Sequence, residues 1–219
     1  MNSRYMTVMD LDRYGRDEIA ADAVVHGLGV LFALIGGPIL IGFVAMHGEA
    51  ATITAISIYV ATLIAMFSLS ASYNLIPIPA AKDWLRRLDH STIYLKIAGA
   101  YTPFAAISIG GFVGWTLLGG VWAAAILGIA LKILFPRRFD RFSLLLYLGM
   151  GWAAIVIGPE VAASVDPETM TLIAIAGGLY TFGVVFHVWE SLKFQNAIWH
   201  VFVLAATAVL YAAMAVEFA

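Results

Sequence analysis

The sequence contains no cysteine and few charged residues, and each of these absences excludes a class of protein. Without thiols, the chain can form neither a disulfide framework nor a thiolate metal site. Charged residues make up 12% of the chain and hydrophobic residues 62%, a balance that excludes an ordinary soluble domain. Basic residues form no tract that could follow a phosphate backbone, so we expect no nucleic-acid partner.

Long apolar runs dominate the rest of the sequence. A bilayer core needs about 20 apolar residues per helix, and seven stretches meet this length, at 24–46, 52–77, 91–110, 112–134, 142–163, 169–189 and 197–216. Only Gly110 and Gly111 divide the third stretch from the fourth. The sequence therefore predicts an all-α integral membrane protein, with an N-terminal segment (1–23) followed by a seven-transmembrane helix bundle (24–219).

Lysine and arginine are distributed unevenly between the two ends of the predicted bundle. Eleven of the twelve lie before the first span or at the connections after the second, fourth and sixth spans, whereas the loops "HGEAA" and "SVDPETM" contain none. Cytoplasmic loops of membrane proteins are enriched in these residues. We therefore expect a cytoplasmic N-terminus and an external C-terminus, with Lys96 as the one basic residue inside a span.

Polar side chains from five predicted helices converge near the cytoplasmic end. They are His26, Ser70, Ser72, Asn74, Asp89, His90, His187, Glu190, Asn196 and His200. Buried polar groups in a membrane protein usually face the bundle interior or a water-filled cavity. This convergence predicts a polar cavity that opens to the cytoplasm.

The spacing of these residues adds detail. Ser70 and Asn74 are four residues apart, as are Asn196 and His200, and each pair therefore shares one face of its helix. Asp22 and His26 have the same spacing.

Each polar residue also has a purely structural interpretation. A histidine at a helix end can be an interfacial residue, and an asparagine in a membrane helix can hold helices together. Lys96 lies two turns beyond Asp89, and we expect its long side chain to orient Asp89 or to pair with Glu190. A purely structural role for each residue does not explain well why polar side chains from several helices gather at the same depth.

Five motifs give the sequence a family resemblance that extends from about Glu18 to the last span. They are "VVHGLG" (24–29), "SLSASYN" (68–74), "RRLDHSTIYLKIAGAYTPF" (86–104), "GGLYTFGVVF" (177–186) and "NAIWHVFVL" (196–204). With these motifs the chain resembles the haemolysin III family of bacterial membrane proteins, within the progestin and adipoQ receptor superfamily. The resemblance implies a seven-helix bundle in the bacterial inner membrane, with a zinc site near the cytoplasmic side.

The resemblance also implies a set of site residues. Family members hold zinc with three histidines, one of them four residues after a serine and two in an H-x-x-x-H pair in the last helix, while an aspartate holds the metal-bound water. This sequence matches the serine as Ser70, the aspartate as Asp89 and one metal ligand as His200. At the other two histidine positions it has Asn74 and Asn196.

The two asparagines put zinc in question, because zinc prefers imidazole, thiolate or carboxylate ligands and an amide oxygen suits harder cations. A hydrogen-bond network could replace the metal, a different ion could bind, or His26, His90 or His187 could replace the missing ligands. The family also has a histidine at the position of His26. We expect a retained polar site, with His26, Asn74, Lys96 and Asn196 beside the matched residues and with weak or no zinc binding.

Two functions are compatible with these residues. The first is a sensor or regulator of membrane homeostasis whose polar site binds a membrane lipid or a small lipid-like ligand. The alternative is a zinc-dependent intramembrane hydrolase of a lipid amide bond, with Asp89 as base or orienter and Ser70 stabilising the developing charge. The sequence determines neither the ligand nor the oligomeric state.

Overall fold

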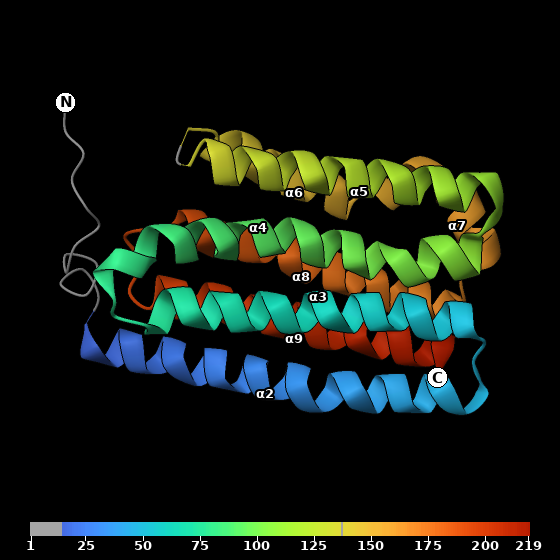
Figure 1. Cartoon of the computed structure of the whole chain (residues 1–219), viewed down its shortest axis with the longest axis horizontal. Helices are drawn as coiled ribbons and strands as arrows, with labels where there is room; N and C mark the ends of the chain where they lie inside the picture. Colours follow the sequence, from blue (N-terminus) through green and yellow to red (C-terminus); the bar gives the residue numbers. More distant parts are fainter. Residues whose placement is uncertain (1–14, 137) are drawn as a thin grey trace.

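The computed structural model describes residues 15–136 and 138–219, and within these residues it contains helices and no strand. Six long helices form the bundle: α2 (Arg16–His47), α3 (Ala50–Leu75), α4 (Pro79–Pro103), α5 (Gly111–Leu134), α8 (Pro167–Val188) and α9 (Gln195–Phe218). The shorter segments are the π-helix η1 (Phe104–Ile109), α6 (Asp140–Gly151), the 3-10 helix η2 (Ala153–Ile157) and α7 (Gly158–Ser164). The axes of the long helices run side by side along the bundle (Figure 1).

Six segments of the described chain are long and apolar enough to cross a membrane. They are α2, α3, α5, α8, α9 and the stretch Phe142–Ser164, which runs through α6, η2 and α7. These six agree with six of the seven predicted spans. The remaining one, predicted at 91–110, coincides with the second half of α4 and with η1. The first half of α4 contains the charged sequence "KDWLRRLD", so the seventh crossing stays a prediction.

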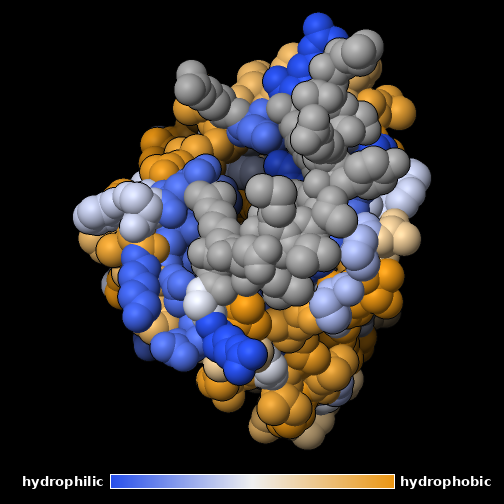
Figure 2. All heavy atoms as spheres, turned by 90° about the vertical axis from the view of Figure 1, so that its left-hand side faces the viewer, coloured by the Kyte–Doolittle hydropathy of each residue, from blue (hydrophilic) through white to orange (hydrophobic). Residues whose placement is uncertain are grey.

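The outer surface of the bundle is apolar, as a membrane-embedded surface must be. Phe112 is 87% exposed and Val156 is 86% exposed, and both belong to segments that could cross a membrane. Figure 2 shows hydrophobic residues along the sides of the molecule and hydrophilic residues around the end that faces the viewer. Monomeric soluble proteins rarely expose such large apolar areas. The pattern therefore agrees with a lipid-facing surface.

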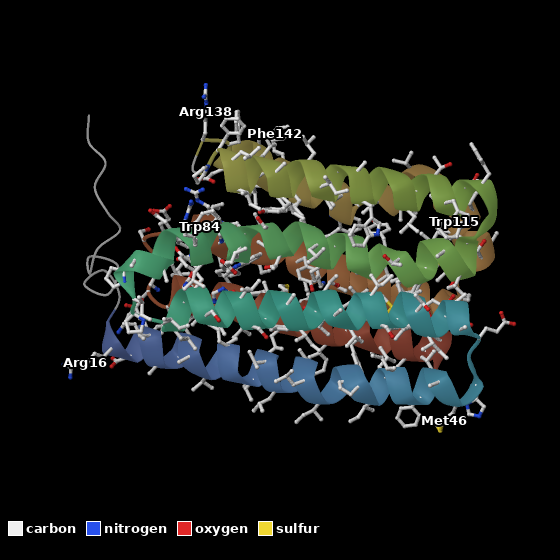
Figure 3. The ribbon with its side chains drawn as sticks, viewed as in Figure 1. Arg16, Met46, Trp84, Trp115, Arg138 and Phe142 are labelled. Atoms are coloured by element: carbon white, nitrogen blue, oxygen red, sulfur yellow. The ribbon has the colours of Figure 1, made fainter. Side chains whose placement is uncertain are left out.

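Neighbouring helices follow a simple order through the bundle. Helix α3 packs against α2 and α4, α5 packs against α4, and α9 packs against α2 and α8. Figure 3 places Arg16, Trp84 and Arg138 at one end of the bundle, and Met46 and Trp115 at the other. The contact between α2 and α9 joins the first and last helices, and it positions the site described below.

Two glycines make the turn between the third and fourth predicted spans. Gly110 has a φ of 60° and Gly111 a φ of 53°, values that residues with a Cβ adopt rarely. Helix α5 begins at Gly111. The division predicted at this glycine pair is therefore confirmed.

The fifth predicted span, 142–163, is not one continuous helix. Helix α6 ends at Gly151, a 3-10 segment follows, and α7 begins at Gly158 with a proline in its first turn. Glycine weakens a helix interior, and Pro159 lacks the N–H that a continuous helix would need. The predicted span is therefore present at Phe142–Ser164, but it is built from α6, η2 and α7 and not from one regular α-helix.

Helix α2 begins at Arg16, well before the predicted start at 24. The Glu18 carboxylate accepts a hydrogen bond of 2.8 Å from the Gly15 N–H at the start of this helix. The same carboxylate accepts a bond of 2.7 Å from the Phe194 N–H, just before α9. The earlier start includes Asp22 in the same regular helix as His26.

Close packing between α3 and α4 depends on Gly99. A Cβ at this position would lie 2.1 Å from the Thr62 hydroxyl oxygen, whereas a Cβ at Gly42 would meet nothing within 4 Å. We expect Gly99→Ala to destabilise the protein by about 1–3 kcal/mol, because overpacking forces the helices apart. Thermal unfolding in detergent measures the effect. Gly42→Ala is the matched control and should leave the Tm unchanged or raise it, and equal Tm values for both variants would contradict the prediction.

Candidate functional site

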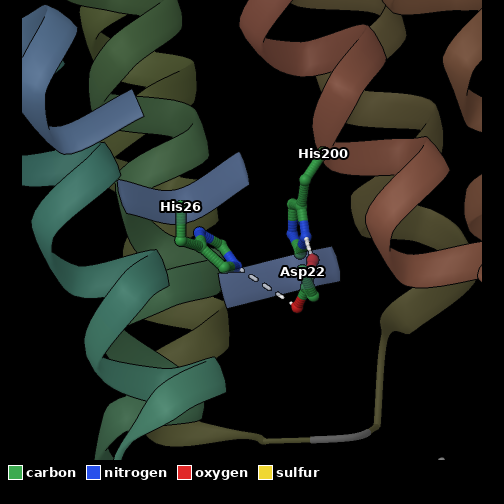
Figure 4. Close-up of side chains that lie close together, drawn as sticks. All are labelled: Asp22, His26 and His200. Carbon is green, nitrogen blue, oxygen red and sulfur yellow. Dashed lines mark hydrogen bonds and ion pairs between the residues drawn. The ribbon is translucent and has the colours of Figure 1, made fainter. Parts of the chain in front are cut away.

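Three ionisable side chains meet where α2 and α9 pack together at the hydrophilic end of the bundle. Asp22 and His26 lie one turn apart on α2, and His200 comes from α9 (Figure 4). Asp22 is 6% exposed and His26 is 2% exposed. The three side chains are called the Asp22–His26–His200 triad below.

The Asp22 carboxylate lies between the two imidazoles of the triad. Its Oδ1 is 2.6 Å from His200 Nδ1, and its Oδ2 is 3.5 Å from His26 Nε2. The centroids of the two imidazole rings are 4.2 Å apart. Each histidine therefore presents a ring nitrogen to the same carboxylate.

Two asparagines extend this polar group toward α3. The Asn196 amide nitrogen lies 3.4 Å from Asp22 Oδ2 and donates to Asn74 Oδ1 at 3.2 Å. The Asn74 amide nitrogen in turn donates to the backbone carbonyl of Ser70 at 2.9 Å. Both asparagines thus belong to a hydrogen-bond network that joins α2, α3 and α9.

The triad has a donor set that fits a metal ion. One ligand atom from each residue can be chosen so that all three lie within 4.8 Å of one another. His26 Nε2 is buried and contacts Asp22 Oδ2 at 3.5 Å without a hydrogen bond of ordinary length. Two imidazoles and one carboxylate form catalytic zinc sites and also bind other transition metals.

Ser70 and Asp89 lie beside the triad in the same cavity. The Ser70 side chain approaches the Asp89 carboxylate, and His200 and His26 are near enough to interact with that carboxylate electrostatically. Asp89 is not part of the close group of three ligands. The structure therefore gathers the predicted residues Ser70, Asp89 and His200, and leaves Asp89 free of the tightest cluster.

Of the three histidines considered as replacement ligands, only His26 joins His200. His90 packs near the ring of Tyr73, with centroids 6.4 Å apart. His187 packs against Trp199, with centroids 5.0 Å apart. Neither belongs to the triad.

The partner of Lys96 differs from the prediction. Its ammonium hydrogen-bonds to the Tyr180 hydroxyl of α8 and lies 4.2 Å from the centroid of the Tyr180 ring. We expected it to orient Asp89 or to pair with Glu190. The Lys96 side chain instead extends sideways toward α8, because a tyrosine there offers both a hydroxyl and an aromatic face.

Asp22 was not among the site residues predicted from the sequence. The spacing to His26 placed both residues on one helical face, but Asp22 preceded the predicted span and fell in the N-terminal segment. The signal that could have found it was this spacing, read together with a helix that begins before the apolar run.

A large cavity connects the triad to the apolar interior of the bundle. Its volume is about 820 Å³, within the range of small-molecule sites. At the polar end it is lined by the triad, Ser70, Asn74, Asp89 and Asn196. It continues past Lys96 into a region lined mainly by apolar side chains, including Phe104, Met170, Val203 and Leu210.

Comparison with known proteins identifies the family of the chain. A family model described as haemolysin-III related matches residues 19–211. Hemolysin-3 of Bacillus cereus is 38% identical over 201 residues, which cover 92% of this chain and 91% of that protein. A hemolysin-3 homolog of Bacillus subtilis is 38% identical over 196 residues, which cover 90% and 92% of the two chains.

A more distant relative extends the comparison beyond bacteria. The monocyte to macrophage differentiation factor of Homo sapiens is 27% identical over 205 residues, which cover 90% of this chain and 83% of that protein. The matches span nearly the whole membrane domain. The chain is therefore a multi-pass membrane protein that belongs to the haemolysin III family.

Proposed function

We propose that this protein is a sensor or regulator of membrane homeostasis that binds one lipid-like molecule in its internal cavity. The observation that carries the proposal is the continuity of the cavity, which runs from the Asp22–His26–His200 triad into apolar surroundings. An amphiphile has a polar head and an apolar chain, which could lie at the polar end and in the apolar part of this cavity, respectively. The volume of about 820 Å³ is large enough for a small-molecule ligand.

The proposal includes a topology. Seven crossings, with α4 and η1 as the third, place the N-terminus and the C-terminus on opposite sides of the membrane. Arg16 and Arg138 lie at the end of the bundle that also holds the triad (Figure 3). Because basic residues mark the cytoplasmic side, we assign the triad to the cytoplasmic end of a bacterial inner-membrane protein.

Filling the cavity tests the proposal directly. We expect tritiated hexadecan-1-ol to bind saturably to the protein in lipid nanodiscs, after correction for empty nanodiscs. Ala174 lines the cavity from α8, so Ala174→Trp should lower the affinity by about tenfold or more by occupying space. Ala123 is exposed on α5 and does not line the cavity, so Ala123→Trp is the matched control. Binding that is absent, or equal in both variants, would contradict the proposal.

A second function, hydrolysis of a lipid amide, is favoured by the donor set of the triad. Asp22, His26 and His200 would hold a zinc ion, which supplies Lewis acidity and a water that ionises near neutral pH. The Asp89 carboxylate would accept a proton in the same cavity, and Ser70 beside it would keep that carboxylate in place. The apolar chamber would hold the acyl chain.

The hydrolase has a test that is independent of ligand binding. We expect Asp89→Asn to lower the release of hexadecanoate from N-hexadecanoylsphingosine by about a hundredfold or more, since an acid or base residue contributes at least that factor. Asp17→Asn, an exposed change on α2, should leave the rate unchanged. Two outcomes would exclude this function. The first is a release of hexadecanoate no greater than that of empty nanodiscs, and the second is a release that neither Asp89→Asn nor a chelator lowers.

A further inference from the structure

Lys96 carries an ammonium group into the interior of the bundle. The residue is 4% exposed and lines the cavity. At the ordinary helical rise it lies roughly 10 Å deeper along α4 than Asp89. A buried charge at such a position costs free energy unless it is paired, and charged groups inside a membrane usually mark a functional site.

The partners that the structure gives Lys96 are neutral. The Tyr180 hydroxyl accepts its hydrogen bond, and the same hydroxyl lies 2.6 Å from the Thr207 hydroxyl of α9. No carboxylate among residues 15–136 and 138–219 forms an ion pair with Lys96. The hydroxyl and the aromatic face stabilise the ammonium, but they do not neutralise its charge.

Two other basic groups that line the cavity, Lys132 and Arg86, have an anionic partner. Lys132 Nζ is 2.6 Å from Asp140 Oδ1, and an Arg86 nitrogen is 3.4 Å from Asp140 Oδ2. Burial by itself raises the pKa of Asp140, but the hydrogen bond and the charge of Lys132 outweigh it and hold that pKa below its usual range. The charges at this mouth of the cavity are thus partly balanced within the protein, unlike the charge of Lys96.

Beyond Lys96 the cavity becomes apolar. Its walls there include Ala100, Phe104, Met170, Ile173, Val203 and Leu210. Phe104 is the first residue of η1, directly after α4, and lies about 12 Å from Lys96 along the helix at the ordinary helical rise. An amphiphile with its head at Lys96 can therefore place an alkyl chain against these side chains.

We propose that Lys96, together with the Tyr180 hydroxyl that also lines the cavity, binds the carboxylate of a single-chain amphiphile whose alkyl chain lies in the apolar part of the cavity. This inference rests on the proposed function and adds the class of ligand and the residue that selects it. One ammonium balances the single charge of a carboxylate. A phosphate monoester carries close to two negative charges near neutral pH and would need further cations.

A pair of probes with the same chain and different heads tests this assignment. Tritiated hexadecanoate and hexadecan-1-ol are compared in lipid nanodiscs at alkaline pH, so that the carboxylate of the probe is ionised. The wild-type protein should bind hexadecanoate about tenfold more tightly than the alcohol, a difference of about 1.4 kcal/mol. Lys96→Met should remove this preference without changing the affinity for the alcohol.

Two further variants serve as controls. Lys96→Arg keeps the charge and should keep the preference. Lys193 is exposed in the connection between α8 and α9 and does not line the cavity, so Lys193→Met should behave as wild type. Unchanged binding of the alcohol by Lys96→Met shows that the variant is folded.

The outcomes separate this inference from the proposed function. Saturable binding of the alcohol without a preference for hexadecanoate, or a preference that persists in Lys96→Met, overturns the role of Lys96 alone. Absence of saturable binding for both probes overturns the proposed function and the role of Lys96 together.

Discussion

Asp22→Asn is expected to lower the affinity of the metal-free protein for zinc by about a hundredfold or more. The carboxylate is the anionic member of the triad, and it also contacts both imidazoles. Changes to residues that only support metal ligands commonly cost 10–100-fold in affinity, so the loss of a ligand should cost at least as much. Asparagine has nearly the same shape, which limits any effect on folding.

Competition between the protein and a chromophoric zinc chelator measures this affinity. Asp17→Asn removes one carboxylate from an exposed position on the same helix and should bind zinc as the wild type does. Equal affinities for Asp22→Asn and the wild type would contradict a metal site at the triad. The network of Asn74 and Asn196 would then be the reason for the clustering, and the cavity would act without zinc.

The double variant Asn74→His/Asn196→His is expected to raise zinc affinity by about a hundredfold, because two amides become imidazoles, which zinc prefers. Both asparagines lie beside the triad, where Asn196 contacts Asp22 and Asn74. The family resemblance implies histidines at these two positions. With His200 they would complete a set of three imidazoles in a cavity that already contains Asp89.

The control for this gain keeps the amide chemistry and changes the size of the side chains. Asn74→Gln/Asn196→Gln adds length without adding imidazole, so it should not raise the affinity for zinc. The same chelator competition applies to both double variants. If the histidine pair binds zinc no more tightly than the glutamine pair, the positions do not face a common metal site.

The sequence by itself predicted most of the helical segments and the gathering of polar residues near one end of them. Apolar runs of about 20 residues are a property of the chain, because a bilayer core sets the length of any helix that crosses it. The pairs Ser70–Asn74 and Asn196–His200 were equally predictable, since residues four apart share a face in any regular helix. Together they predicted a polar site with His200, Asn74 and Asn196, and the structure places all three in one network.

Breaks in helices were less predictable from the same information. Glycines at 149 and 151 and Pro159 weaken the fifth predicted span, but apolar composition alone does not show where a helix changes to 3-10 geometry. The structure locates the change at Ala153–Ile157. Local preferences and packing together decide such a boundary.

Only the tertiary structure decided which side chains on different helices meet. Asp22 joined the site because α2 begins at Arg16 and packs against α9, where His200 lies. Lys96 met Tyr180 rather than Asp89 or Glu190 because α8 brings a hydroxyl and an aromatic ring to that side of α4. Helical periodicity fixes which residues share a face, whereas the partner of that face depends on how the helices pack around the cavity.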